Sequence, residues 1–265
     1  MSVLLHISDT HFGTEQPRVV EALVTLAAQQ RPDLVVLSGD ITQRARPAQF
    51  RAAKAFVDRL DAPVLAVPGN HDIALFNLWV RFTRPYARYA KVFGPDLEPV
   101  HVSQDLLVIG VDTTRAWRFK NGKVTAEQVD RVARWLEGAS ARQLRVVVVH
   151  QPAAVIMAAD RADLLRGHQV ALRAWSAAGA DLVLGGHIHL PYTLAQHGLS
   201  RPLWVVQAGT AVSSRIRGRV GNSVNILRWG TSTGTGRNCL IERWDYALNE
   251  DAFVRTLVTG VEPAR

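Results

Sequence analysis

The hydrophobic residues of the first 190 positions follow two alternating patterns. Short continuous apolar runs predict β-strands buried on both faces, as parallel strands are, and apolar residues three or four positions apart predict helices between them. The runs are Val3–Ile7, Leu34–Leu37, Val64–Val67, Val146–Val149 and Leu182–Leu184, and the helical sets begin at Val19, Phe50 and Val129. Val100–Val102 and Leu106–Val111 predict a hairpin with its turn near Ser103–Asp105.

After Pro191 the apolar runs are separated by Gly, Ser and Asn, which predicts an antiparallel sheet. These runs are Tyr192–Ala195, Leu203–Val206, Val224–Leu227 and Leu240–Trp244. Alternating βαβ units followed by consecutive strands predict an α/β fold with a two-layered mixed β-sheet core, a β-sandwich, flanked by helices. No repeat or linker interrupts the chain, so we expect one domain over residues 1–265. In it, residues 1–190 form the βα core and residues 191–265 complete the second sheet.

Each of the five buried runs is followed within three residues by Asp, Asn or His. The segments are Leu4–His11, Val35–Asp40, Leu65–Asp72, Val146–His150 and Leu182–His189. In open α/β sheets the functional crevice lies beyond the carboxyl ends of the strands, so these polar residues should meet at one edge. Asp9 and His11 are two positions apart, as are His187 and His189, and an extended chain would project each pair to one side.

Each of these strand ends also has an ordinary structural interpretation. Asp9 and Asp40 could be helix N-caps, Pro68–Asn70 is a good turn sequence, and His150 could be a hydrogen-bonded structural histidine. The glycines that precede Asp40, Asn70 and His187 allow tight turns at the strand ends. Five independent turns should not all place a metal-competent residue at a strand terminus, however. Together they favour one metal site.

Taken in order, D-x-H, G-D, G-N-H-D, a strand-final His and G-H-x-H resemble the motifs of the calcineurin-like metallophosphoesterase superfamily over residues 9–189. The resemblance implies that superfamily's architecture and a dinuclear metal centre. The first metal would be held by Asp9, His11, Asp40 and His189, and the second by Asp40, Asn70, His150 and His187. The resemblance further implies that Asp40 bridges the metals, that His71 is a catalytic histidine that binds no metal, and that Asp72 orients His71.

The chemistry of such a site suits phosphoester hydrolysis. Two divalent ions about 3.5–4 Å apart clamp the attacking and leaving oxygens of an in-line displacement. An anionic bridge, here Asp40 with a shared hydroxide, holds the cations together, and the metals lower the pKa of the bridging water. A mixed imidazole and carboxylate set suits Mn, Fe or Zn better than Ca, and no cysteine ligand gives a preference for Zn. We expect two divalent metal ions of this group as cofactors.

The motif variants resemble those of bacterial class III cyclic-nucleotide phosphodiesterases and glycerophosphodiesterases, which share S-D-T-H, G-D-[IL]-T, G-N-H-D and G-H-x-H. Asp72 stands where protein Ser/Thr phosphatases of the superfamily carry Glu, and Thr42–Ala45 holds no tyrosine of the kind that purple acid phosphatases use as a ligand. The resemblance therefore implies a metal-dependent phosphodiesterase for a small phosphodiester, with a 3′,5′-cyclic nucleotide as the first choice.

The alternative is a phosphomonoesterase, or a pyrophosphohydrolase for a lipid or nucleotide-sugar diphosphate such as UDP-diacylglucosamine. Thr10 replaces the Leu that is usual in the UDP-diacylglucosamine enzymes. An inactive scaffold with this fold is disfavoured, because no ligand position is vacant. The apolar segment after the G-N-H-D motif would favour a lipid substrate if its apolar face were exposed. It contains Leu75, Phe76, Leu78, Trp79, Val80 and Phe82.

Substrate contacts are less constrained by the sequence. The planar fork of arginine suits phosphate oxygens, and aromatic faces can stack a base. The candidates are Arg81, Arg84, Arg115, Arg118, Arg215 and Arg217, with Trp79, Trp117, Phe119 and Tyr192 for stacking. For each of them, surface charge or packing is the simpler role. The remaining histidines, His6, His101, His168 and His197, are expected to be structural or exposed.

The net charge of +8 favours anionic partners in general. Only four of the 31 basic residues are lysines, and the basic residues are scattered, with the densest cluster at Arg215–Arg219. We therefore expect a small-molecule phosphoester substrate and no nucleic acid. Peripheral membrane contact and a homodimer both stay open.

The single cysteine, Cys239, excludes an internal disulfide framework and is typical of a protein of the reducing cytoplasm. No apolar run approaches the ~20 residues that span a bilayer. The N-terminus lacks the basic and apolar regions of a secretory signal. We expect a cytoplasmic protein.

Overall fold

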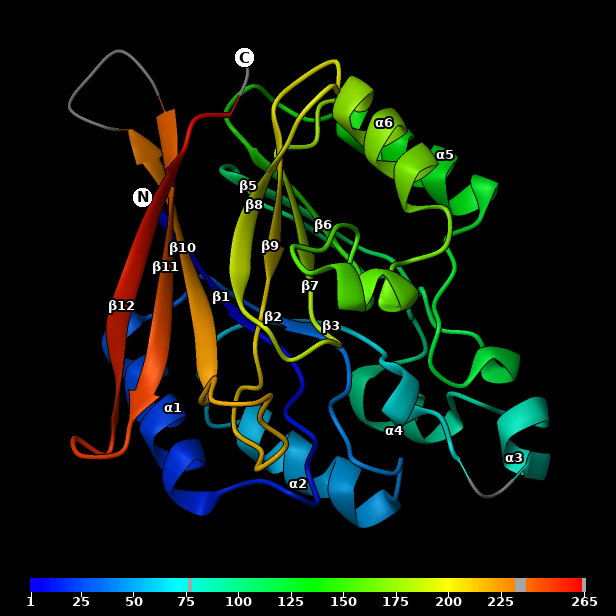
Figure 1. The fold of residues 1–265 in the computed structure, drawn as a ribbon, viewed down its shortest axis with the longest axis vertical. Coiled ribbons are helices and arrows are strands. Elements are labelled where there is room, and N and C mark those ends of the chain that lie inside the picture. The colour runs from blue at the N-terminus through cyan, green and yellow to red at the C-terminus, as the bar shows by residue number, and fades with distance from the viewer. Residues whose placement is uncertain (76–77, 232–236, 264–265) are drawn as a thin grey trace.

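Two six-stranded β-sheets pack face to face between helices in the computed structural model (Figure 1). The structure describes residues 1–75, 78–231 and 237–263. Phe76 of the apolar segment noted above lies outside the described residues. The arrangement confirms the predicted α/β fold with a two-layered mixed sheet core.

The first sheet combines the N-terminal parallel strands with the last strands of the chain. Its strands are Ser2–Ile7 (β1), Leu34–Ser38 (β2), Val64–Val67 (β3), Ser223–Thr231 (β10), Arg237–Ala247 (β11) and Ala252–Val261 (β12). Their spatial order is β12-β11-β10-β1-β2-β3. β1, β2 and β3 are parallel, whereas β10 pairs antiparallel with β1 and leads outward to β11 and β12.

The second sheet is parallel in its centre and antiparallel at both edges. Its strands are Val100–Val102 (β4), Leu106–Gly110 (β5), Leu144–Val148 (β6), Leu182–Gly185 (β7), Tyr192–Gln196 (β8) and Leu203–Gln207 (β9), in the spatial order β4-β5-β6-β7-β9-β8. β5, β6, β7 and β9 are parallel. At one edge β4 pairs antiparallel with β5, and at the other β8 pairs antiparallel with β9. The predicted hairpin is the β4–β5 pair.

The longer helices lie outside the two sheets. They are Pro17–Gln30 (α1), Pro47–Val57 (α2), Leu78–Thr83 (α3), Ala87–Phe93 (α4), Ala126–Glu137 (α5) and His168–Ala178 (α6), with short 3₁₀ turns at Asn70–Asp72 (η1), Ala116–Arg118 (η2) and Ala158–Asp163 (η3). All of these helices except α3 pack apolar residues against a sheet. α1 and α2 each begin with proline, which suits the first helical position. Among the described residues no helix is both long and apolar enough to cross a membrane.

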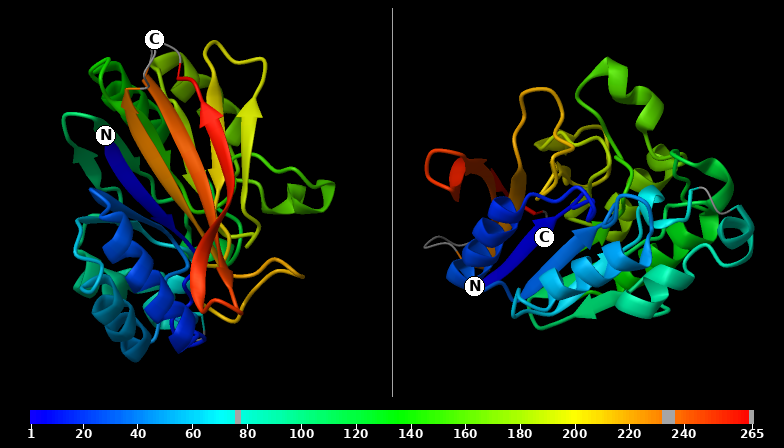
Figure 2. Two further views of the ribbon diagram at one scale, coloured as in Figure 1. Left: turned by 90° about the vertical axis from the view of Figure 1, so that its left-hand side faces the viewer. Right: turned by 90° about the horizontal axis from the view of Figure 1, so that it is seen from below.

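Alternate residues of the central strands pack into different apolar layers. In β1, Leu5 and Ile7 pack with residues of α1 and α2, whereas Leu4 packs between the sheets. In β6, Val146 faces the layer between the sheets and Val147 packs with α5 and α6. The result is four layers, helix–sheet–sheet–helix, and Figure 2 shows the blue N-terminal helices and the green helices apart from each other. Strands buried on both faces explain the continuous apolar runs.

Three features differ from the sequence-based predictions. The strands after Pro191 divide between the sheets: β8 and β9 join the second sheet, but β10, β11 and β12 extend the first. α6 was not predicted, because its buried face includes Ala171 and Ser176 while Val170 is exposed, which weakens the helical pattern. β12 was not predicted because it is an edge strand whose middle is exposed to solvent.

Candidate metal centre

The turns that follow the parallel strands adopt left-handed backbone conformations. Asp9, His11, Asp40, His187 and His189 have φ angles of 52°, 43°, 48°, 74° and 56°. The chain is therefore not extended after β1 and β7, which was the condition for each pair of side chains to project to one side. Residues other than glycine rarely adopt this backbone conformation, and those that do cluster at functional sites. The chain reverses at these points, which aims the polar side chains into the space beyond the strand ends.

Backbone hydrogen bonds hold these turns against one another. The amide of Asp9 donates to the carbonyl of Gly39 at 3.1 Å, and the amide of His11 donates to the carbonyl of Asp40 at 3.0 Å. A Cβ on Gly69 would collide with the backbone of Asp40. Glycine is thus required there for close approach of two strand ends, whereas Gly39 is also required for its φ of 93°.

Asp9, His11 and His189 form the first cluster of candidate ligands. The Nε2 atoms of His11 and His189 lie 3.1 Å apart, and Asp9 Oδ1 lies 3.7 Å from the first and 3.2 Å from the second. The other oxygen of Asp9 accepts the amide hydrogen of His187 at 2.9 Å. Ligands about 2.0–2.2 Å from one ion are separated by about 3–3.6 Å, so this spacing fits a shared cation.

Asp40, His150 and His187 form the second cluster. His150 Nε2 lies 3.3 Å from Asp40 Oδ1 and 3.2 Å from Asn70 Oδ1. The other oxygen of Asp40 lies 3.8 Å from Nε2 of His11, in the first cluster. Asp40 is therefore placed between the two clusters, where a bridging carboxylate would lie.

The tautomers of two histidines are fixed by their second ring nitrogen. Nδ1 of His150 donates to the carbonyl of Ser38 at 2.8 Å, and Nδ1 of His189 donates to the carbonyl of Arg215. Each ring therefore presents the lone pair of Nε2 to its cluster. Metal-binding histidines are commonly oriented in this way.

Several buried polar atoms of the site lack a hydrogen-bond partner within the described residues. They are both ring nitrogens of His187 and Oδ1 of Asp9. Leaving such atoms unpaired is costly unless an ion or water satisfies them. A cation in each cluster would satisfy Oδ1 of Asp9 and one of the two ring nitrogens of His187, and the donor set of imidazole and carboxylate suits a transition metal. The residues present fit a dimetal centre.

The electrostatics of the site favour cations. Burial alone would raise the pKa values of Asp9 and Asp40, but the surrounding histidines outweigh it and hold both pKa values below their usual range. Burial lowers the pKa of His150, yet neighbouring Asp40 more than compensates and raises it to about 9. Without metal, protonated histidine balances the carboxylates, and bound metal would displace those protons.

His71 lies beside the clusters but belongs to neither. Its Nδ1 donates to the carbonyl of Gln43 at 2.9 Å, which leaves Nε2 near Nη1 of Arg215 at 3.2 Å. The expectation that Asp72 orients the His71 ring is wrong. Asp72 is buried and instead accepts the amide hydrogens of Thr42, Ile41 and Gly69, which fastens the second strand end to the third.

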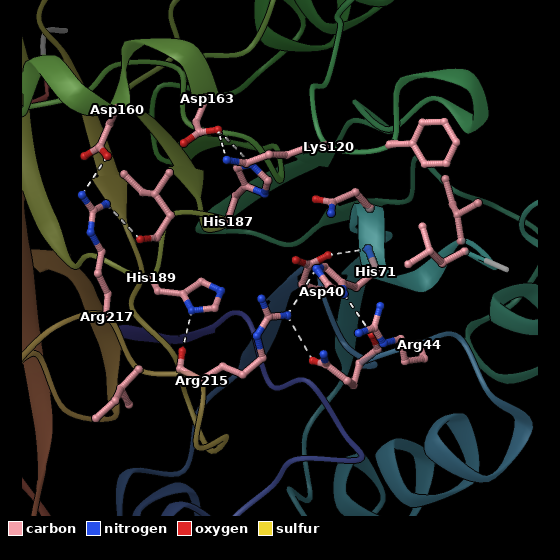
Figure 3. Close-up of a pocket in the computed structure, with 17 residues that line it drawn as sticks. Asp40, Arg44, His71, Lys120, Asp160, Asp163, His187, His189, Arg215 and Arg217 are labelled. Atoms are coloured by element: carbon pink, nitrogen blue, oxygen red, sulfur yellow. Dashed lines mark hydrogen bonds and ion pairs between the residues drawn. The ribbon is translucent and has the colours of Figure 1, made fainter.

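A cleft of about 550 Å³ opens above the clusters (Figure 3). Its lining combines the metal-site residues with further side chains from six segments between the strands. These are Gln43, Arg44, Ile73, Leu75, Phe119, Lys120, Asp160, Asp163, Ile188, Arg215, Ile216 and Arg217. Arg215 Nη1 also contacts Gln43 Oε1 at 3.1 Å, whereas Arg217 pairs with Asp160 at 2.8 Å.

Only some of the residues predicted to contact substrate lie at the cleft. Arg215, Arg217 and Phe119 line the cleft, and the other candidates do not. Arg81 is buried and donates to backbone carbonyls, and Arg115 bonds to backbone carbonyls and Gln128. Trp79 and Trp117 are exposed outside the cleft, and the Tyr192 hydroxyl donates to Ala154. His6, expected to be structural, is buried and hydrogen-bonded to Ser38.

Four charged residues of the cleft were not predicted: Arg44, Lys120, Asp160 and Asp163. Asp163 pairs with Lys120 at 2.6 Å and lies 3.9 Å from Nε2 of His187 (Figure 3). His187, as the largest effect, and Lys120 lower the pKa of Asp163 to about 2. Asp160 and Asp163 lie in η3, whereas Arg44 and Lys120 come from two other loops, and no motif in the sequence joins these three segments.

Comparison with known proteins agrees with this geometry. Residues 2–191 match the family described as calcineurin-like phosphoesterase. A probable cyclic nucleotide phosphodiesterase of Synechococcus sp. is 28% identical over 70% of this chain and 72% of its own. A glycerophosphodiester phosphodiesterase of Enterobacter lignolyticus is 36% identical over 26% of this chain and spans only 29% of that enzyme. A dimetal phosphatase of Danio rerio has the same fold, with a TM-score of 0.68 and 13% identity over 99% of both chains.

Proposed function

The chain belongs to the calcineurin-like phosphoesterase family, and on that premise we propose that it is a metal-dependent phosphodiesterase that hydrolyses a small phosphodiester in the cleft. The observation that carries the proposal is the position of Asp40. Its two oxygens face histidines of two separate ligand clusters, at 3.3 Å and 3.8 Å. Such a carboxylate is what a two-metal hydrolase needs to hold its ions together.

The proposed ligands are the seven residues already named. The first ion would be held by Asp9, His11, Asp40 and His189, and the second by Asp40, Asn70, His150 and His187. When bound, two divalent ions supply a water-derived nucleophile near neutral pH and neutralise charge on the phosphoryl group. Mn, Fe and Zn remain the proposed metals, and a cytoplasmic location remains a prediction.

His71 and Arg215 would handle the phosphoryl and leaving groups. In hydrolysis the water oxygen forms a bond to phosphorus, the bond from phosphorus to the leaving oxygen breaks, and that oxygen takes a proton. Nε2 of His71 faces the cleft, and when the ring carries a proton on both nitrogens it can donate this proton, or a hydrogen bond, to the leaving oxygen while Nδ1 stays bound to Gln43. The Arg215 guanidinium, 3.2 Å from Nε2, can bind the non-bridging oxygens.

A 3′,5′-cyclic nucleotide is the proposed substrate. The relative from Synechococcus is named a probable cyclic nucleotide phosphodiesterase, and the match covers 70% of this chain. A cleft of about 550 Å³ is large enough for a nucleotide, and Phe119 at its edge offers a face for a base. Arg217 and Lys120 also line the wall, each paired with an aspartate of the cleft, Asp160 and Asp163.

One observation favours the second candidate, a pyrophosphohydrolase for a lipid-linked diphosphate such as UDP-diacylglucosamine. Leu78, Trp79 and Phe82 of α3 are 55%, 70% and 57% exposed. The apolar segment after the G-N-H-D motif therefore does present an apolar face to solvent. An amphiphilic substrate would explain it.

A substrate panel with metal analysis tests the proposal. Purified protein is assayed with 3′,5′-cAMP, 2′,3′-cAMP, glycerophosphodiesters, UDP-diacylglucosamine, an aryl diester and an aryl monoester, after loading with Mn²⁺, Fe²⁺ or Zn²⁺. We expect two metal equivalents and the highest kcat/KM with a 3′,5′-cyclic nucleotide. Preference for the monoester would refute the phosphodiesterase assignment, and preference for UDP-diacylglucosamine would select the second candidate.

A further inference from the structure

Five large apolar side chains are exposed beside the cleft on two neighbouring segments. Leu78, Trp79 and Phe82 belong to α3, whereas Trp117 and Phe119 lie in and directly after η2, with 66% and 50% of their surfaces exposed. We call these five residues the aromatic platform. Soluble monomers rarely expose large apolar residues in groups, and such groups commonly mark interaction surfaces.

A buried arginine joins the two segments. Arg81 of α3 is 1% exposed, and it donates from Nε to the carbonyl of Ala116 at 2.6 Å and from Nη1 to the carbonyl of Ala74 at 3.1 Å. Its guanidinium also lies over the Phe119 ring, 4.2 Å from the centroid. No carboxylate pairs with Arg81 among the described residues. This side chain therefore holds α3 against η2, so that the platform is one surface.

The charge of the two segments is entirely of one sign. Residues 78–95 and 113–126 contain no Asp or Glu. They contain Arg81, Arg84, Arg88, Lys91, Arg115, Arg118, Lys120 and Lys123. Lys120 pairs with Asp163, and Arg115 lies 3.9 Å from Asp112. Two arginines have no ion pair within the described part of the chain. They are Arg84, which follows α3, and Arg118, which stands between Trp117 and Phe119.

We propose that the aromatic platform docks on an anionic phospholipid surface. Trp79, Phe82 and Trp117 would enter the interfacial layer, and Arg84 and Arg118 would meet the lipid headgroups. Tryptophan and phenylalanine with flanking arginine and no acidic residue suit this interface, where apolar burial and attraction to anionic lipid act together.

Two other occupants fit the surface less well. A second copy of the chain bound through the same platform would bring two surfaces without a carboxylate against each other. Single-stranded nucleic acid would use aromatic faces for stacking, but Leu78, at 55% exposure, offers no face to a base. Acyl chains accept leucine and tryptophan alike.

Docking would also orient the cleft. Phe119 belongs to the platform and also lines the cleft. Its neighbour Lys120, which is not part of the platform, lines the cleft too (Figure 3). The cleft opening would therefore lie close to the membrane surface. The proposal does not depend on which substrate is hydrolysed, because association with a membrane is measured without turnover.

Flotation with lipid vesicles tests the proposal. Full-length protein is mixed with vesicles of phosphatidylcholine alone or of phosphatidylcholine with phosphatidylglycerol. The wild type should float with the anionic vesicles, bind less at high salt, and stay behind with neutral ones. The double variant Trp79→Ser/Trp117→Ser should lose at least about tenfold in partitioning. Trp135→Ser, which removes an equally large side chain that is 44% exposed on α5, should bind as the wild type does.

Two further measurements keep the result interpretable. Hydrolysis of a soluble aryl diester by the double variant should match the wild type, which shows that the variant is folded. Lipids brominated near the headgroup should quench tryptophan emission of the wild type and not of the double variant. Equal binding by the double variant would overturn the proposal. So would loss of a dimer or of oligonucleotide binding in that variant without any vesicle binding by the wild type.

Discussion

The floor and the rim of the cleft are built in different ways. The floor residues Asp9, His11 and Asp40 are buried at the ends of parallel strands, and backbone hydrogen bonds between the strand ends fix them. At the rim, Lys120 and Arg217 come from loops and are held by ion pairs, with side chains 62% and 30% exposed. The strand ends therefore hold the candidate metal ligands, whereas the loops form the part of the cleft that the proposed substrate would contact.

The largest expected effect lies in the floor. Asp40→Asn removes the one negative charge that faces both ligand clusters. We expect metal content well below two equivalents and a fall in kcat of about 10³-fold or more. Metal analysis and steady-state kinetics measure both. Asp58→Asn, at an exposed carboxylate paired with Lys54, should change neither. An Asp40→Asn enzyme with two metals and normal turnover would show that the floor does not act as described.

Substitution of His71 should affect catalysis without affecting metal binding. Because it contacts Gln43 and Arg215 but neither cluster as a ligand, His71→Ala should keep two metal equivalents. Loss of a positioned proton donor should lower kcat by about 10²–10⁴-fold. The matched control is His101→Ala, outside the cleft. Full activity of His71→Ala would remove His71 from the mechanism, and loss of metal would make it a ligand.

Asp181 is a buried acid that lies outside the metal site, at the opposite end of β7 from His187. His187 follows one end, and Asp181 precedes the other, where it accepts the amide hydrogen of Arg145 at 2.9 Å. Burial raises the pKa of Asp181 to about 6, above the value of about 3.9 in an unfolded chain. The folded state therefore binds this proton more tightly. The stability that results is present below pH 4 and is lost as the pH rises through 6.

Asp181→Asn removes this dependence. The free energy of unfolding of the wild type relative to the variant should fall by about 2 kcal/mol between pH 4 and pH 7. Urea unfolding at several pH values measures it. A constant difference between the two proteins, or one that grows with pH, would show that Asp181 is not protonated by its burial.

The smallest effect is expected at the rim. Arg217 bonds to Asp160 and to the carbonyl of Ile188, and its remaining donor capacity faces the cleft. Arg217→Ala should raise KM about tenfold for an anionic substrate while kcat changes little, because uniform binding is lost. Arg219→Ala, at an exposed neighbour, is the control. A large fall in kcat with unchanged KM would assign Arg217 to the floor instead.

The floor could be predicted from the sequence because each of its ligands stands next to an apolar run. The runs define strands, and parallel strands end at one edge, so Asp40 and His150 are predictably close. The conformation of the ligands was not predictable. Whether Asp9 and His187 have positive φ depends on hydrogen bonds between strand ends that are distant in sequence.

The rim could not be predicted in the same way. Arg81 and Arg215 are both arginines near apolar segments, but one is buried against backbone carbonyls and the other lines the cleft. Asp163 has no motif, and only the folded chain brings it near His187. For the fold, β12 and α6 were missed because exposure or small buried residues blur their patterns. Local sequence therefore predicts the positions of strand ends well and the contacts between loops poorly.

The most direct measurement of the central claim is the location of the metals by anomalous X-ray diffraction from crystals soaked in Mn²⁺. We predict two peaks about 3.5–4 Å apart. One should lie between His11 and His189, the other between His150 and His187, with Asp40 in contact with both. A single peak, or two peaks of which one does not touch Asp40, would contradict the account.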